Sequence, residues 1–277
     1  MSIMSYTGGT VFAMAGSECV CIASDLRIGE RMTTLSVTEK KVHKIADKVY
    51  LGLAGFHSDA KTVLDKIIFR KTLYELRENR KLKPKVAATM ISNLAYQHRF
   101  GSYFSEPLVA GLDPISNKPY ICAMDTIGNI GNPDDFVAVG TGAEYLLGVA
   151  ETFWKPNMNS EELFEATSQS MLAALERDAA SGWGVVVYLV TKDKCPPFYV
   201  HSGMTMRQIV LLMFISSLAV SDGFYVKNDG NVMELMLEKK SSNLKRLHGL
   251  GSRNCYFSPV NCVIQHDLAS YKKLIGA

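Results

Sequence analysis

Residues 8–41 read GGTVFAMAGSECVCIASDLRIGERMTTLSVTEKK and decide the fold class. Two apolar runs at 10–15 and 19–24 are separated by a Gly-Ser-Glu turn and predict a hairpin of largely buried strands. Asp25 follows the second run directly, and Lys41 follows a β-branched stretch at 33–37. A nucleophile at the start of the chain, activated by a buried Asp/Lys pair, would need this order. The question is then whether the first strand begins with such a nucleophile.

Composition places the chain among ordinary globular proteins. It has 277 residues, of which 47% are hydrophobic and 21% charged, and a net charge of +3. Nine basic and five acidic side chains follow position 194, so residues 1–194 are nearly neutral and show no basic face for nucleic acid. The six cysteines lack zinc spacing and are interpreted as buried reduced thiols, and we expect no metal or cofactor.

Targeting segments are not expected. The first residues, MSIMSYTGG, lack the basic and apolar regions of a secretory signal. The longest apolar run, 209–220, is shorter than the roughly 20 residues of a membrane helix. We therefore expect no membrane partner for the main part of the chain.

Strands and helices are predicted in groups. The hairpin is followed by strands at 33–37 and 49–54, and Ser58 and Asp59 are expected to cap a helix that ends near position 80. The remaining predictions are a helix at 84–99, strands at 107–112, 119–124 and 136–139, helices at 143–153 and from a Ser160 cap to about 176, and a strand at 184–190.

This order does not alternate as a parallel doubly wound sheet would. Antiparallel sheets with helix pairs packed outside fit it better. The expected fold class is therefore α+β, a four-layer α-β-β-α sandwich of two antiparallel sheets.

Several motifs together resemble the proteasome beta subunits. They are Asp25-Leu26-Arg27 after a buried strand, Lys41, Leu53-Ala54-Gly55, the run 103–114 and the run 177–182, RDAASG. The likeness covers residues 1–194. It implies the N-terminal nucleophile hydrolase fold and a place in the 20S core particle, whose beta and alpha subunits form heteroheptameric rings in a 28-subunit core. It also implies contact with a regulatory particle through the complex, ubiquitin-dependent protein degradation, and a location in cytoplasm and nucleus.

In active members of this family a threonine freed by self-cleavage after glycine is the nucleophile. It lies 16 residues before the Asp-x-Arg aspartate and 32 before the lysine. Counting back from Asp25 and from Lys41 leads both times to Gly9. Thr10 follows Gly9 and is the alternative nucleophile, but a shift of one residue in a strand sends its side chain to the opposite face.

The expected role is therefore a non-catalytic subunit with a vestigial pocket. By resemblance, Gly55 matches the oxyanion glycine, Thr141 a supporting serine, and Asp178 and Ser181 the residues around the threonine amine. We expect Asp25 and Lys41 to form a structural charge pair. An active peptidase using Thr10 and a free-standing hydrolase of the same fold remain alternatives.

Asp125 is the candidate for a role in a neighbour. By resemblance its region borders the substrate channel of the adjacent type-2 beta subunit, where its carboxylate would suit basic side chains. The alternative is a turn residue that accepts backbone N–H bonds. His57, His98 and Cys122 are interpreted as surface or packing residues.

Residues 195–277 depart from the family and are treated as an atypical C-terminal extension, separate from the domain at 1–194. Cys195-Pro196-Pro197 stands where the last strand of the family begins, and proline cannot donate ladder N–H bonds. We expect the strand to be lost. The extension is interpreted as aberrant coding sequence without order, as a segment that packs on a neighbour, or as an interfacial anchor at 209–220.

Overall fold

The computed structural model describes residues 3–192 and 197–200, which lie in one compact unit. The elements of this part are η1 (Ile3–Ser5), β1 (Thr10–Ala15), β2 (Val20–Asp25), β3 (Ile28–Glu30), β4 (Thr33–Ser36), β5 (Val42–Ala46), β6 (Val49–Gly55), α1 (His57–Glu78), α2 (Pro84–Gln97), β7 (Ser105–Leu112), β8 (Pro119–Met124), β9 (Ile130–Gly131), β10 (Phe136–Gly140), α3 (Ala143–Phe153), α4 (Ser160–Leu175), β11 (Val185–Val190) and β12 (Pro197–Val200).

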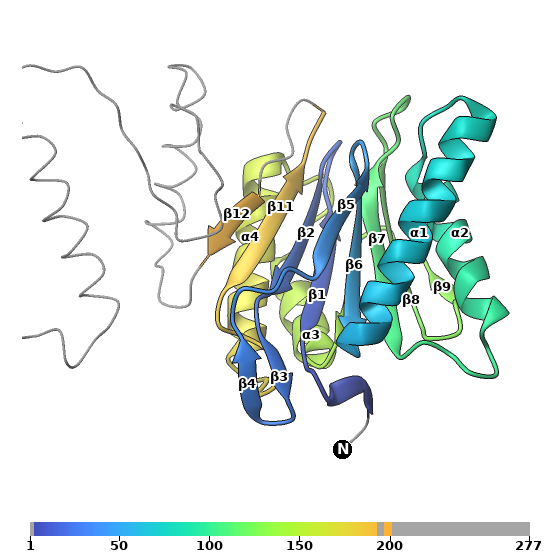
Figure 1. Cartoon of the computed structure of the whole chain (residues 1–277). Coiled ribbons are helices and arrows are strands. Elements are labelled where there is room, and N and C mark those ends of the chain that lie inside the picture. The colour runs from blue at the N-terminus through green and yellow to red at the C-terminus, as the bar shows by residue number, and fades with distance from the viewer. Residues whose placement is uncertain (1–2, 193–196, 201–277) are drawn as a thin grey trace, which may run out of the picture. The chain divides into compact units, whose positions relative to one another are not determined.

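Two five-stranded antiparallel sheets form the body of the molecule. Their strand orders are β10-β1-β2-β11-β12 and β5-β6-β7-β8-β9, and β3 pairs with β4 in a separate hairpin. Figure 1 shows this hairpin beyond the end of the first sheet, close to the N-terminal turn. Strand β1 lies inside its sheet, between β2 and β10, so the start of the chain is held on both sides.

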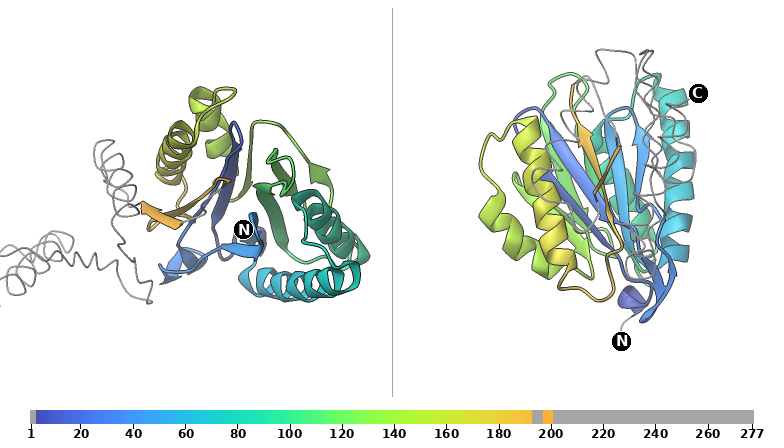
Figure 2. Two further views of the ribbon diagram at one scale, coloured as in Figure 1. Left: turned by 90° about the horizontal axis from the view of Figure 1, so that it is seen from above. Right: turned by 90° about the vertical axis from the view of Figure 1, so that its left-hand side faces the viewer.

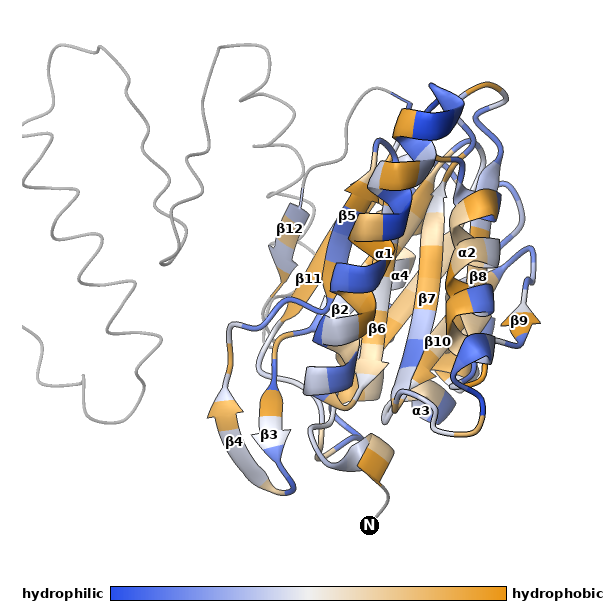
Figure 3. Cartoon of the chain, turned by 45° about the vertical axis from the view of Figure 1, so that its right-hand side comes forward, coloured by the Kyte–Doolittle hydropathy of each residue, from blue (hydrophilic) through white to orange (hydrophobic). Residues whose placement is uncertain are grey.

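Alternation along the strands creates three apolar layers. Phe12 and Met14 of β1 face the cluster that packs against α3 and α4, whereas Val11 and Ala13 face the space between the sheets. The second sheet does the same, since its outer face packs against α1 and α2. Figure 2 shows the four layers from above, and Figure 3 shows apolar residues on the strands and inner helix faces. The predicted α-β-β-α sandwich is confirmed.

Two predicted helix caps were wrong. Helix α1 follows Phe56, which gives no side-chain cap, and the carboxylate of Asp59 accepts a bond from the Phe104 N–H instead. Helix α4 is capped by Asn159 rather than Ser160, in a reciprocal capping box with Glu162. Helix α1 therefore begins without a side-chain cap, and the cap of α4 lies one residue before the predicted position.

The prediction that the last strand is lost was also wrong. Residues Pro197–Val200 form β12 and pair with β11, with Val200 opposite Val185. Pro197 is the first residue of the strand, where the missing N–H is tolerated. Phe198 packs its ring against Phe164 of α4, with centroids 4.9 Å apart. The predicted alternatives for the segment beyond Val200, including the apolar run at 209–220, lie outside the described residues.

Strands β3 and β5 were not predicted, because one has three residues and the other is interrupted by charge. Strand β5 reads VHKIA and shifts register against β6 after Lys44. Among the described residues, no helix has the length and apolar character needed to cross a membrane.

Candidate functional site

The buried pair of Asp25 and Lys41 lies at the open end of β2. Lys41 Nζ is 2.8 Å from Asp25 Oδ1 and also donates to the carbonyl oxygens of Asp25 and Arg27, at 3.2 and 2.7 Å. The side chain of Lys41 is 6% exposed and that of Asp25 is 0% exposed. Three acceptors thus match the three hydrogens of the ammonium group, so its charge is compensated without water.

Asp25 is saturated as well. Its Oδ1 accepts a bond from the Thr10 N–H at 2.9 Å, and its Oδ2 accepts from the N–H groups of Arg27 and Gly182, both at 3.2 Å. The carboxylate therefore joins the start of β1, the end of β2 and the loop before β11. Every one of these groups is fixed backbone or a buried cation, so together they hold the carboxylate in one orientation.

Gly9 is the residue that faces Lys41. A Cβ placed on Gly9 would overlap Lys41 Cε, and the backbone φ of Gly9 is +117°. An L-residue rarely adopts that conformation. The lysine chain occupies the volume where a side chain at position 9 would go.

Thr10 points elsewhere. Its hydroxyl accepts a bond from the Gly142 N–H at 2.9 Å and lies 2.7 Å from Ser181 Oγ. Ser181 Oγ lies 3.0 Å from Thr141 Oγ1, which donates to Asp178 Oδ2 at 2.6 Å. Thr141 gives its only hydrogen to the carboxylate, so it accepts a hydrogen bond from Ser181. Ser181 in turn accepts one from Thr10, and each hydroxyl donates toward Asp178.

This hydroxyl chain lies on the opposite side of β1 from the lysine. Thr10 is fully buried, and its hydroxyl is used both as acceptor and as donor. A nucleophile has to reach a substrate carbonyl, so a hydroxyl in this position has no access to one. The structure thus brings Asp25, Lys41 and Gly9 together on one side, and Thr10, Thr141, Asp178 and Ser181 on the other.

Arg27 is the site residue whose role the sequence did not reveal. It is 1% exposed, and its guanidinium donates to the carbonyl oxygens of Ala180, at 2.7 Å, and Arg31, at 3.1 Å, and to the Thr34 hydroxyl at 3.0 Å. It therefore ties the β3–β4 hairpin to the loop that carries Asp178 and Ser181. The Asp-x-Arg motif was the available signal, but it does not reveal the bond to Ala180, which is 153 positions away.

Gly55 ends β6 opposite Ser105. Its carbonyl oxygen accepts a bond from the Thr7 hydroxyl at 2.5 Å. The residue expected to bind an oxyanion is therefore in contact with the N-terminal segment of its own chain.

Asp125 lies in the exposed turn after β8. Its Oδ1 accepts bonds from the N–H groups of Ile127, at 3.0 Å, and Asn129, at 2.8 Å. This is the turn geometry that the sequence offered as the alternative. It engages one carboxylate oxygen, and the side chain is exposed.

The remaining candidates have local roles. His57 lies 3.9 Å from Glu39 on the surface. His98 Nδ1 contacts the Leu94 carbonyl oxygen and its Nε2 the Tyr103 hydroxyl, at 3.1 and 3.3 Å. Cys122 is a free thiol buried in β8. The described residues contain no group of three or more side chains that could hold a metal.

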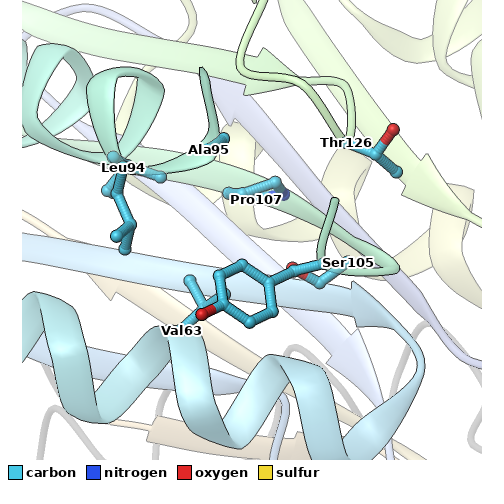
Figure 4. Close-up of a pocket in the computed structure, with 8 residues that line it drawn as sticks. Val63, Leu94, Ala95, Ser105, Pro107 and Thr126 are labelled. Atoms are coloured by element: carbon cyan, nitrogen blue, oxygen red, sulfur yellow. The ribbon is translucent and has the colours of Figure 1, made fainter. Parts of the chain in front are cut away.

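A small cavity near Tyr103 is separate from this site. It lies between α1, α2 and β7 and has room for about one water molecule. Figure 4 shows Val63 and Leu94 on one side of it and Thr126 on the other. Its size and mostly apolar lining offer no place for a substrate.

The sequence matches a known family. The family model described as "Proteasome subunit" matches residues 5–190. The chain belongs to the proteasome subunit family. It is 76% identical to proteasome subunit beta type-3 of Caenorhabditis elegans over 194 residues, which cover 70% of this chain and 95% of the relative.

Other relatives carry the same name. Proteasome subunit beta type-3 of Drosophila melanogaster is 52% identical over 194 residues, again 70% of this chain and 95% of the relative. The Dictyostelium discoideum protein is 48% identical over 191 residues, 69% of this chain and 93% of the relative. These matches confirm the predicted family.

Proposed function

We propose that the chain is a non-catalytic beta subunit of the 20S proteasome core, whose role is to complete the ring and hold its neighbours. The observation that carries the proposal is Gly9, which has no side chain to serve as a nucleophile. The Lys41 side chain occupies the space that a side chain at position 9 would need. The saturated ammonium and carboxylate support a structural role for the pair.

The same proposal includes the assembly. The subunit would sit in a heteroheptameric beta ring of a 28-subunit core in cytoplasm and nucleus, and it would meet the regulatory particle only through the complex. Sedimentation of the native chain tests this point. A free-standing hydrolase would sediment as a monomer, whereas a ring subunit sediments with the core cylinder.

The test of inactivity is the mass of the mature chain in purified core particles. We expect a chain that starts at Met1 or Ser2 and takes up no electrophilic peptide probe directed at N-terminal threonine. A chain that starts at Thr10 would show self-cleavage and would establish the rival function, an active threonine peptidase.

Asp125 is proposed to contribute a carboxylate to the substrate pocket of the neighbouring type-2 subunit. Support comes from its exposure and from the turn bonds that hold one oxygen in place. We expect Asp125→Asn to lower particle cleavage after basic residues several-fold, because the substituted amide lacks the charge that pairs with them. Asp65→Asn, at an exposed position of α1, is the matched control. Equal rates for both variants would reject the pocket role.

A further inference from the structure

The N-terminal segment, residues 3–8, is built into the domain through backbone bonds. The Gly29 N–H donates to the Thr7 carbonyl oxygen at 3.0 Å, and the Arg31 N–H donates to that of Tyr6 at 2.8 Å. The Thr7 hydroxyl donates to the Gly55 carbonyl oxygen. The segment therefore bridges the β3–β4 hairpin and the end of β6.

Side chains reinforce the bridge. The Tyr6 ring meets Phe56 edge-on, with centroids 6.1 Å apart, and the Tyr6 hydroxyl donates to Glu30 Oε1 at 2.7 Å. Met4 Cε lies 3.2 Å from the point where a Cβ on Gly55 would sit. Thr7 itself is 8% exposed. The segment thus covers Gly55 through Met4 and Thr7, and the following Phe56 through Tyr6.

The hairpin needs this support. Strands β3 and β4 have three and four residues, form no part of either sheet, and change register after Ile28. An isolated two-stranded hairpin is marginally stable at best in water. Its described attachments to the body include the Arg27 guanidinium on one side and the N-terminal segment on the other.

We propose that residues 3–8 are a permanent strap that covers Gly55 and fixes the β3–β4 hairpin. The inference rests on the proposed non-catalytic function, because self-cleavage would remove the strap. The amides of Gly29 and Arg31, which could pair with an extended peptide, are already bonded to the strap. The uncleaved N-terminal segment is then a structural element of the mature subunit. It keeps peptide substrates away from Gly55, although the backbone that could bind them is present.

Gly8 offers a sharp test. Its φ is +69°, and a Cβ on it would overlap the carbonyl oxygen of Ala180, a backbone atom that cannot swing away. Gly8→Ala should therefore displace the strap while every other residue of it stays unchanged in sequence. The same Cβ would lie 3.0 Å from Arg27 Nη1, so the second variant below, which acts on the bond from Thr7 to Gly55, separates the strap from the guanidinium as the cause. The matched control is Gly101→Ala, because a Cβ on Gly101 has no atom within 4 Å.

The measurement is hydrogen exchange by mass spectrometry on core particles that contain the full chain. In Gly8→Ala we expect exchange at 3–8 and at 28–36 to be at least ten-fold faster, with α1 and α2 unchanged. Gly101→Ala should leave 3–8 and 28–36 at wild-type rates. Thr7→Val is a milder second variant, which keeps the shape and removes the bond to Gly55, and Thr62→Val, which breaks a hydroxyl-to-carbonyl bond within α1, is its control.

The proposal is overturned if exchange at 28–36 is unchanged in both Gly8→Ala and Thr7→Val. This holds even if residues 3–8 themselves exchange faster. Failure of the proposed function would look different. It would appear as a wild-type chain that starts at Thr10 in the mass spectrum, before any variant is made.

Discussion

At the scale of single residues, the missing hydroxyl at position 9 is part of a larger change. The backbone there has a glycine conformation, and the Lys41 side chain occupies the space beside it. We expect Gly9→Thr to produce no self-cleavage and to lower the free energy of unfolding by roughly 2–4 kcal/mol, the sum expected for a positive φ and a buried overlap. The measurements are the intact mass and the urea midpoint of the full chain.

Gly101→Thr is the control for that substitution, since the position is exposed and has open space around it. It should shift the midpoint by less than about 0.5 kcal/mol. If Gly9→Thr produced a mature chain that begins at position 9, the site would be intact apart from its nucleophile, and the argument from the backbone would be wrong.

Residue spacing predicted part of this site. The spacing of the family, counted back from Asp25 and from Lys41, identified Gly9, and the two-residue period of a strand turned Thr10 to the opposite face. The count could not reveal the bond from Thr7 to Gly55, which spans 48 positions, or the role of Arg27, whose acceptors come from two loops. Contacts of that kind depend on how loops fold over the sheets, and no local pattern encodes them.

At the scale of elements, long periodic segments were predictable and short ones were not. Helices α1 to α4 and the central strands carry enough apolar periodicity to be recognised. Strand β12 was wrongly excluded because Pro196 and Pro197 were treated as breaking its ladder. The sequence alone does not show that the strand begins at Pro197, where no N–H is needed, and that Phe198 and Val200 then fill the core.

Phe198 tests the contribution of β12. Phe198→Ala removes the ring that packs against Phe164, and we expect a loss of about 2 kcal/mol in unfolding free energy, less than for a fully buried phenylalanine because Phe198 is partly exposed. Phe100→Ala is the matched control, since that ring is 93% exposed. Urea midpoints of the two full-length variants are compared, and equal values would mean that β12 adds nothing to the sheet.

At the scale of the whole molecule, stability should depend on pH through the buried core. Burial raises the pKa of the Cys19 and Cys122 thiols to about 11, and that of Tyr188 to about 12. The pKa of Cys21 is raised for the same reason. In the unfolded chain thiols lose their protons near pH 9, while the folded state keeps them. The folded state then binds more protons, so the free energy of unfolding falls as pH rises above about 9.

The expected slope is up to about 1.4 kcal/mol per pH unit for each thiol that stays protonated only in the folded state. Urea midpoints of the full chain at pH 8, 9 and 10 measure it. Cys122→Ala leaves a cavity and lowers every midpoint, but it also removes one titrating group, so its midpoint should fall less steeply between pH 9 and 10 than that of the wild type. Parallel curves for the two proteins would mean that the Cys122 thiol titrates alike in both states, which its complete burial in the cluster beneath α1 and α2 argues against.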